Sequence, residues 1–183
     1  MTNSNKFIFV PGCMLCPTFQ AVRSNKNRQW VQTIMPYLVE NEINVISMPC
    51  PEVTFGGIDM GMKRAPHGIK YYKELNGFES YCALLGKKVI TQINELHQAG
   101  LEIIAIVGIE HSPTCAASYM YTREGTQKRQ GLFVKNIYQT AEELNIPIIG
   151  INRNYPNKFL SELKKIMEKK DDTYKVRNIE SKQ

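Results

Sequence analysis

Four short apolar runs limit the folds that this chain can adopt. They cover 6–10, 43–48, 103–109 and 146–151, and the third is the richest in β-branched residues. Runs that are apolar on both faces are typical of strands buried inside a parallel sheet. The sequence therefore predicts about four core strands.

The segments between these runs have the period of an amphipathic helix. Apolar residues recur every three or four positions over 30–38, 85–96 and 134–144, so each segment has one apolar face. Pro36 is expected to kink or shorten the first helix, and a last helix is expected over about 157–168. Strand and helix alternate four times, which predicts an α/β fold with a Rossmann-like, doubly wound parallel sheet.

A chain of 183 residues is long enough for one domain with a full core, whereas two domains would each be undersized. Its content of 43% hydrophobic and 22% charged residues is typical of a globular protein. We therefore predict a single α/β domain over 1–168. The stretch that follows is rich in charged residues, and we expect 169–183 to form a flexible tail.

The net charge of +6 favours an anionic partner, but much of the excess lies in lysines near the C-terminus. No basic stripe with interleaved aromatic residues is visible, so a nucleic-acid polymer is not an expected partner. No run approaches the roughly 20 apolar residues of a membrane helix, and we expect neither a membrane span nor a signal peptide. The expected location is cytoplasmic, and the sequence does not predict an oligomeric state.

Two predicted connections are far longer than the few residues usual between a strand and a helix. They cover about 51–77 and 112–130. Loops of that length in a compact domain usually carry function.

Three of the five cysteines follow predicted strands. Cys13 ends the first strand, Cys50 ends the second, and Cys115 lies just beyond the third. Ligands of open parallel sheets bind at the carboxyl ends of the strands, so these three thiols are expected to converge there. An odd number of cysteines in a cytosolic chain favours metal binding or catalysis over a disulfide framework.

The remaining cysteines and one histidine leave several arrangements open. Cys82 lies in a predicted helix and is interpreted as a core residue. Cys16 forms a Cys-x-x-Cys pair with Cys13, which suits either a redox dithiol or an additional metal ligand. Three thiolates suit an iron–sulfur cluster with one open iron that acts as a Lewis acid. A Cys₃His zinc site completed by His111 is the competing arrangement.

Three short motifs surround the strand-end cysteines. They are Cys13-Met14-Leu15, then Cys50-Pro51-Glu52 followed by Gly56-Gly57, and then Glu110-His111-Ser112-Pro113-Thr114-Cys115. In this order they resemble motifs of the thiouracil desulfidase family, which consists of iron–sulfur-dependent desulfidases and was formerly a family of unknown function. The resemblance spans about 6–152, and the motifs are fairly specific in combination.

The resemblance implies that Cys13, Cys50 and Cys115 hold one [4Fe-4S] cluster. It also implies removal of sulfur from a thiolated pyrimidine without net redox change. In that reaction the sulfur of the substrate binds the open iron before water displaces it at the ring carbon. The expected ligand is a small thiolated nucleobase or nucleotide, such as thiouracil or a thiouridine nucleotide.

The chain departs from the family pattern at two places. The first family motif usually reads Cys-Leu-Leu-Gly with an arginine and a tyrosine downstream, whereas here Cys16 replaces that glycine and Pro17 follows. The segment 59–66 is also longer than the usual spacing between the Gly-Gly pair and the following Pro-Arg pair. The chain therefore resembles a divergent branch of the family.

Replacing C=S by C=O requires a base for the attacking water as well as activation of the sulfur. Glu52 and Glu110 are the carboxylates nearest the cysteine motifs, and Glu52 is the preferred base. Ser112 is expected to orient a water or to hydrogen-bond the substrate. A solvated glutamate and a turn-initiating Ser-Pro pair are the alternative interpretations.

Three further residues are predicted to bind the substrate. Gly56 and Gly57 would allow backbone N–H groups to approach a phosphate or the cluster. Arg64 lies in a loop rich in basic and aromatic side chains, and its planar fork matches a phosphate. An ordinary turn and a solvated charged loop are the alternative interpretations.

The predicted protein is an enzyme, a [4Fe-4S]-dependent C–S hydrolase that releases hydrosulfide from a thiolated pyrimidine. Two alternatives remain open: a thiol oxidoreductase that uses Cys13 and Cys16, and a zinc-stabilised binding module. The sequence contains no P-loop motif and no Gly-x-Gly-x-x-Gly after the first strand. ATP and dinucleotide chemistry therefore have no support.

Overall fold

The computed structural model describes residues 5–21, 29–122 and 125–180, with the backbone alone for 29 and 171–180. Four strands form one sheet in the order β2-β1-β3-β6, and every neighbouring pair is parallel. The strands are β1 (Lys6–Pro11), β2 (Ile43–Met48), β3 (Glu102–Ile109) and β6 (Ile148–Ile151). The four predicted strands and the Rossmann-like α/β fold are thereby confirmed.

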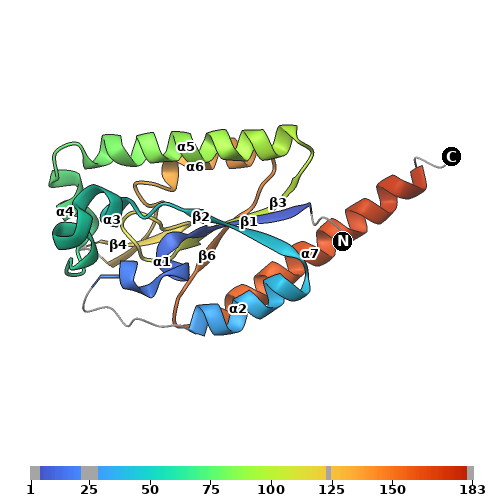
Figure 1. Ribbon diagram of the computed structural model, residues 1–183, viewed down its shortest axis with the longest axis horizontal. Helices are drawn as coiled ribbons and strands as arrows, with labels where there is room; N and C mark the ends of the chain where they lie inside the picture. The colour runs from blue at the N-terminus through green and yellow to red at the C-terminus, as the bar shows by residue number, and fades with distance from the viewer. Residues whose placement is uncertain (1–4, 22–28, 123–124, 181–183) are drawn as a thin grey trace.

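Helices cover both faces of this sheet (Figure 1). α5 (Phe78–Gln98) and α6 (Lys135–Glu143) lie together on one face, and α2 (Gln29–Glu40) and α7 (Pro156–Glu180) lie together on the other. This is the doubly wound arrangement predicted from the alternation of strands and helices. α2 continues past Pro36 to its end at Glu40, so the proline does not shorten it.

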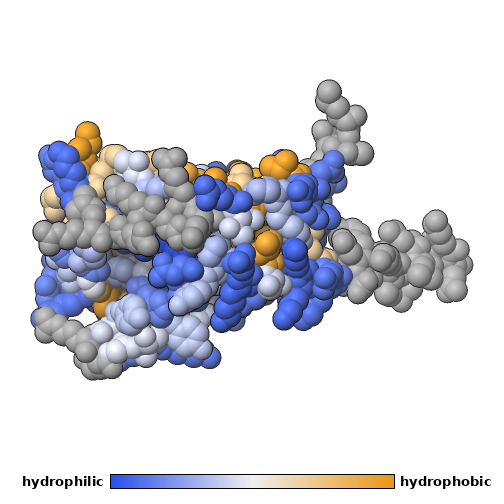
Figure 2. Space-filling view, turned by 90° about the horizontal axis from the view of Figure 1, so that it is seen from below, coloured by the Kyte–Doolittle hydropathy of each residue, from blue (hydrophilic) through white to orange (hydrophobic). Residues whose placement is uncertain are grey.

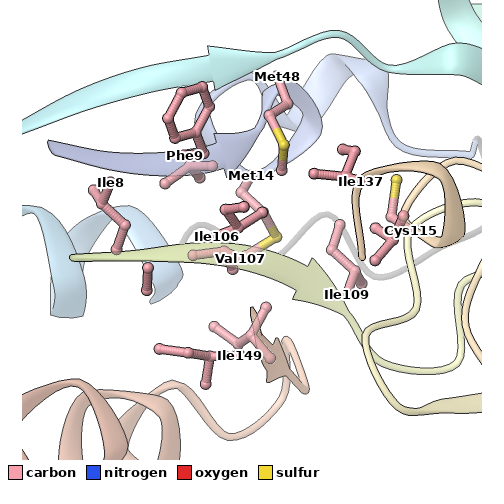
Figure 3. Close-up of a cluster of buried hydrophobic side chains, with 14 of the residues drawn as sticks. Ile8, Phe9, Met14, Met48, Ile106, Val107, Ile109, Cys115, Ile137 and Ile149 are labelled. Carbon is pink, nitrogen blue, oxygen red and sulfur yellow. The ribbon is translucent and has the colours of Figure 1, made fainter. Parts of the chain in front are cut away.

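The place of each strand in the sheet explains its composition. β3 lies inside the sheet and is buried along almost its whole length, which is why it is the most β-branched run. β2 lies at the edge and has half-buried and exposed residues between its buried ends. Figure 3 shows the core around β3, with Ile106 and Val107 on the strand and Cys115 just beyond its end.

The two long connections contain regular structure that the sequence analysis did not predict. The first contains α3 (Pro51–Gly56), the π-helical turn η2 (Gly57–Met62) and α4 (Ile69–Glu74). The second contains an antiparallel hairpin of β4 (Tyr119–Thr122) and β5 (Gly125–Lys128). Such short elements carry too few periods to be recognised from sequence. Figure 1 shows α3, α4 and β4 gathered at one end of the sheet.

Helix α7 is longer than predicted, because it continues to Glu180 instead of ending where a tail was expected. No glycine or proline follows Pro156 in the sequence, so no helix-breaking residue ends the helix early. Lys170 lies in the expected tail, yet its Nζ is 3.2 Å from the carboxylate of Glu102. The helix therefore occupies most of that segment, and 181–183 lie outside the described residues.

The helices turn their apolar sides toward the sheet. Trp30, Ile34 and Leu38 of α2 are buried, and the Trp30 ring packs edge-on against Phe159 of α7. Figure 2 shows the face with α2 and α7 as mainly hydrophilic, with small and separate hydrophobic patches. Within the described ranges, no helix has the length and apolar character needed to cross a membrane.

Candidate functional site

A cavity of about 590 Å³ lies at the carboxyl ends of the strands. In the sheet order β2-β1-β3-β6, the connection after β1 leads to β2 on one side, and the connection after β3 leads to β6 on the other side. Open α/β sheets bind ligands where neighbouring strands connect to opposite sides, which here lies between β1 and β3. Cys13, Cys50 and Cys115 all line this cavity. The structure therefore brings together the three cysteines whose strand-end positions predicted that they would meet.

Each of these cysteines is placed by the local structure at the end of its strand. Cys13 lies in the short helix α1 (Gly12–Leu15), which begins directly after β1. Cys50 is the N-cap residue of α3. Cys115 lies in the turn after β3, and all three residues are at most 7% exposed. The thiols are therefore shielded from bulk solvent.

The three thiols change one another's pKa. The Cys13 thiol donates a hydrogen bond to Cys50, which raises the pKa of Cys13 and lowers the pKa of Cys50. Burial, and then the charge of Cys50, raises the pKa of Cys115. Cys50 is therefore the most readily ionised of the three thiols, and positive charge brought to the site would favour the thiolate form of the other two.

This donor set fits an iron–sulfur cluster. Three buried thiolates repel one another, and a group of iron ions that binds each of them removes that repulsion. Across the described part of the chain, no three His, Cys, Asp or Glu side chains are arranged to share one metal ion. A zinc ion needs four donors around a single point, whereas a cluster distributes its thiolates over separate irons. The zinc site of the three cysteines and His111 therefore stays an untested alternative.

Cys16 and Cys82 do not line the cavity. Cys16 is the C-cap residue of α1, so it does not share the cavity with Cys13 as a catalytic dithiol would. Cys82 is fully buried in α5, where burial raises its pKa to about 12. The interpretation of Cys82 as a core residue is confirmed, and the dithiol alternative gains no support.

Glu52 forms a buried ion pair with Arg64 in the cavity wall. The Nε of Arg64 donates to one carboxylate oxygen, and the hydroxyl of Thr114 donates to the other at 2.7 Å. Nη1 of Arg64 also donates to the carbonyl oxygens of Phe19 at 2.8 Å and Gly61 at 2.6 Å. These contacts make Arg64 a structural partner of Glu52 and of the neighbouring backbone, and the binding of phosphate by Arg64 stays a prediction.

Glu110 holds the start of the hairpin. Its Oε2 accepts hydrogen bonds from the backbone N–H groups of Tyr119 at 2.7 Å and Ser118 at 3.3 Å. Its other oxygen occupies the place where a Cβ on Gly150 would lie, so β6 needs glycine at that position. Glu110 lines the cavity, and these contacts give it a positioning role, while its role as a base stays a prediction.

Ser112 shapes the turn that carries Cys115. Its Oγ accepts the backbone N–H of Thr114 at 3.3 Å and that of Cys115 at 3.1 Å. The chain after the hairpin passes so close that a Cβ on Gly131 would overlap the carbonyl group of Thr114. The N–H of Phe133 donates to the same carbonyl oxygen at 2.9 Å. The turn is therefore held mainly by contacts to the main chain.

Gly56 and Gly57 lie outside the cavity. A Cβ on Gly56 would come within 2.7 Å of the backbone nitrogen of Gly61, and Gly57 has a φ of +63°. The two glycines form the tight turn between α3 and η2, which folds the chain back so that Arg64 reaches Glu52. Their predicted contact with substrate therefore has no support in the structure.

His111 lies on the side of the cavity next to the hairpin. It has a φ of +68°, and its ring stacks on that of Tyr121 with centroids 4.3 Å apart. Its Nδ1 is buried and has no hydrogen-bond partner within the described ranges. The stacked pair adds an aromatic surface to a wall that contains both polar and apolar groups.

Several residues that line the cavity were not among the predicted site residues. They are Gln20, His67, Tyr72, Thr114, Tyr121 and the triplet Asn152-Arg153-Asn154. The triplet directly follows β6, so polar residues after a fourth strand were an available signal. Tyr72 lies in the loop rich in basic and aromatic side chains, whereas Gln20 had no such signal, because the path of the chain after β1 brings it to the site.

Comparison with known proteins finds one significant relative without an assigned activity. The chain is 29% identical over 140 residues to the uncharacterized protein MJ0003 of Methanocaldococcus jannaschii, which covers 74% of this chain and 80% of the relative. No family model matches the chain, and no solved structure matches it significantly. The fold and the site geometry therefore carry the functional argument.

Proposed function

We propose that this protein is a [4Fe-4S]-dependent desulfidase that acts on a thiolated pyrimidine. The proposal rests on the meeting of Cys13, Cys50 and Cys115 in one buried cavity at the carboxyl edge of the sheet. The motifs around these cysteines also resemble those of the thiouracil desulfidase family. We infer that the chain is a divergent member of that family.

The proposed reaction is a hydrolysis. Water forms a C–O bond at the ring carbon, the C–S bond breaks, and sulfur leaves as hydrosulfide without net oxidation or reduction. A cluster bound by three thiolates supplies one iron without a protein ligand, which is a Lewis acid for the sulfur of the substrate. Cys13, Cys50 and Cys115 are the residues that hold it in this proposal.

Glu52 is the carboxylate best placed to take a proton from the attacking water. Its two oxygens offer about four lone-pair sites, so the bonds from Thr114 and Arg64 leave room for a further donor. The Ser112 oxygen accepts the backbone N–H groups of Thr114 and Cys115, and its hydroxyl lies 3.2 Å from that of Thr114. Because the Thr114 hydroxyl donates its proton to Glu52, the Ser112 hydroxyl is the donor to Thr114 and helps to position Glu52. The chain thus offers the Glu52 carboxylate as an acceptor beside the cysteines, positioned by the hydroxyl groups of Thr114 and Ser112.

Reduced thiols suit a cytoplasmic protein, since disulfides are rare in that compartment. All five cysteines of the structure are free, which agrees with this proposed location. The proposed partner is a small thiolated nucleobase or nucleotide.

The decisive experiment is anaerobic reconstitution of the full chain with iron and sulfide, followed by an absorption spectrum and metal analysis. We expect a brown protein with about four irons and four sulfides per chain, and release of hydrosulfide from 2-thiouracil, 4-thiouracil or their nucleotides. A colourless protein that binds stoichiometric zinc and leaves all thiopyrimidines unchanged would contradict the proposal.

A further inference from the structure

Gln20 has an unusual environment for a polar side chain. It follows the 3-10 turn η1 (Pro17–Phe19) and is 2% exposed. Its Nε2 donates a hydrogen bond to the carbonyl oxygen of Cys13 at 3.0 Å. That bond fixes the orientation of the amide, because only the nitrogen can donate to a carbonyl oxygen. Oε1 is therefore the atom that points away from Cys13, and it is buried without a partner in the described ranges.

Buried polar atoms without a partner are few in this protein and are concentrated at the cavity. Within the described ranges, the side-chain atoms of this kind are Gln20 Oε1, His111 Nδ1 and Trp30 Nε1. Gln20 and His111 both line the cavity, whereas Trp30 packs against Phe159 in the core. An unpaired buried acceptor is costly, so its presence in a cavity wall indicates that a bound molecule completes it.

We propose that Gln20 is a substrate-binding residue whose Oε1 accepts a hydrogen bond from a ring N–H of the substrate. An amide oxygen only accepts, so its partner must be a donor. The bond from Nε2 holds the Gln20 amide next to the backbone of Cys13, one of the three proposed cluster ligands. A substrate whose sulfur binds the cluster would present the N–H next to its C=S group to Oε1. The inference takes its ligand, a thiolated pyrimidine, from the proposed function. It specifies in addition which N–H group of the ring is recognised.

N-methylated probes test this directly. In 4-thiouracil only N3 is next to the C=S carbon, so a methyl group at N3 removes the recognised donor and a methyl group at N1 does not. For the reconstituted wild type we expect 3-methyl-4-thiouracil to lose about tenfold or more in kcat/KM relative to 1-methyl-4-thiouracil. Calorimetric binding of uracil, 1-methyluracil and 3-methyluracil should show the same preference.

The variant Gln20→Met keeps the length of the side chain and removes the amide. We expect it to reduce the preference between the two methyl isomers to about threefold or less. Exposed Gln92 on α5 lies outside the cavity, so Gln92→Met is the matched control and should keep the wild-type preference. Iron and sulfide counts on both variants show whether the Cys13 end of the site still holds the cluster.

The ratio of kcat/KM for the two methyl isomers shows whether Gln20 binds the substrate or only positions Cys13. If Gln20 only held the carbonyl of Cys13, Gln20→Met would lower activity or iron content equally for both isomers and leave their ratio unchanged, which would overturn the inference. Equal use of both isomers by the wild type, or no binding of any of these rings, would overturn it as well. A wild type that binds uracil with the N3 preference but releases no hydrosulfide would contradict the proposed reaction and support the role of Gln20.

Discussion

Cys50 and Cys115 reach the cavity in two different segments of the chain, each at or in one of the long connections. The two segments are held in place in different ways. The Cys50 segment (50–72) is held by side chains, since Glu52 and Arg64 form an ion pair that is shielded from solvent. The Cys115 segment (110–134) is held by its backbone, which bonds to side-chain oxygens and to the chain that passes over it. The same task is thus done by charge pairing in one segment and by backbone packing in the other.

These two ways of holding a loop have different weak points. A buried ion pair fails when one partner is removed, because the other is left charged and without compensation. A turn packed against backbone fails when a side chain is added where glycine is required, because there is no room for it to relax. Substitutions of each kind should therefore act mainly on their own segment, and the bond from Thr114 to Glu52 is the contact through which an effect would pass to the other.

The largest effect, on iron content and activity, is expected from replacing the cysteines. Here the two segments should behave alike. Cys50→Ser and Cys115→Ser each remove one of three thiolates, so we expect both to lose the cluster absorption and measurable hydrosulfide release. Iron analysis after identical reconstitution is the measurement. Cys82→Ala is the control and should keep the wild-type iron content, since Cys82 lies outside the cavity. Full iron content in either serine variant would show that the replaced cysteine is not a ligand of the cluster.

The next largest effect is expected in the Cys50 segment. Arg64→Met leaves the Glu52 carboxylate, which is 9% exposed, without its counter-ion, and breaking such a buried pair costs about 3–5 kcal/mol in the free energy of unfolding. Denaturant titration measures this, and adding Glu52→Gln to the variant should restore part of the loss.

The neighbouring residue Lys63 supplies the matched control. Its pair with Asp59 is exposed, so Lys63→Met should change the free energy of unfolding by only about 0–1 kcal/mol. Equal effects of Arg64→Met and Lys63→Met would show that charge pairing does not hold the Cys50 segment.

A smaller effect is expected in the Cys115 segment. The added methyl group of Gly131→Ala would overlap the carbonyl group of Thr114, and crowding of this kind costs about 1–3 kcal/mol. Because the turn with Cys115 must move, we also expect lower iron content after reconstitution. At Gly68 nothing lies within 4 Å of an added Cβ, so Gly68→Ala should change stability by less than about 0.5 kcal/mol. A stable Gly131→Ala protein would contradict the tight packing of this turn.

The smallest effect is expected from Ser112→Ala. The backbone N–H groups of Thr114 and Cys115 lose their acceptor, which costs about 1 kcal/mol in the free energy of unfolding. Ser161→Ala, on the exposed side of α7, removes only a bond to the carbonyl oxygen of Asn157 and should be nearly neutral. If thermal unfolding shows no difference between the two variants, the hydroxyl of Ser112 does not hold the turn.

The sequence predicted the core of the fold better than the structure of its connections. All four strands and the helices between them were predicted, because each has an apolar period that its own residues display. The short elements of the long connections were missed, and α7 was ended too early because a charged helix surface and a charged tail look the same in sequence. The amphipathic period of a helix is a local property of its sequence. Where no proline or glycine ends a helix, its last residue depends on tertiary contacts such as that of Lys170 with Glu102.

The candidate site divides in the same way. The convergence of the three cysteines was predicted, because a residue at the end of a parallel strand has a fixed place relative to its neighbours. The ion pair of Arg64 with Glu52 and the contacts of Glu110 with the hairpin were not predicted, since the spacing of residues does not show which side chains pair. Gln20 was missed entirely, although it is among the few cavity residues with an unsatisfied atom.

The sequence by itself determined the sheet, its buried strands and the edge at which the cysteines meet, because period and strand-end position follow from local backbone geometry. Only the tertiary structure decided which polar side chains pair with one another and which face the cavity. Glu52 and Arg64 are brought together by a turn that needs Gly56 and Gly57, and Gln20 is oriented by the carbonyl of Cys13. Such contacts depend on how the long connections run through space. That path cannot be predicted from the residues of a single segment, because it is fixed by packing between segments distant in sequence.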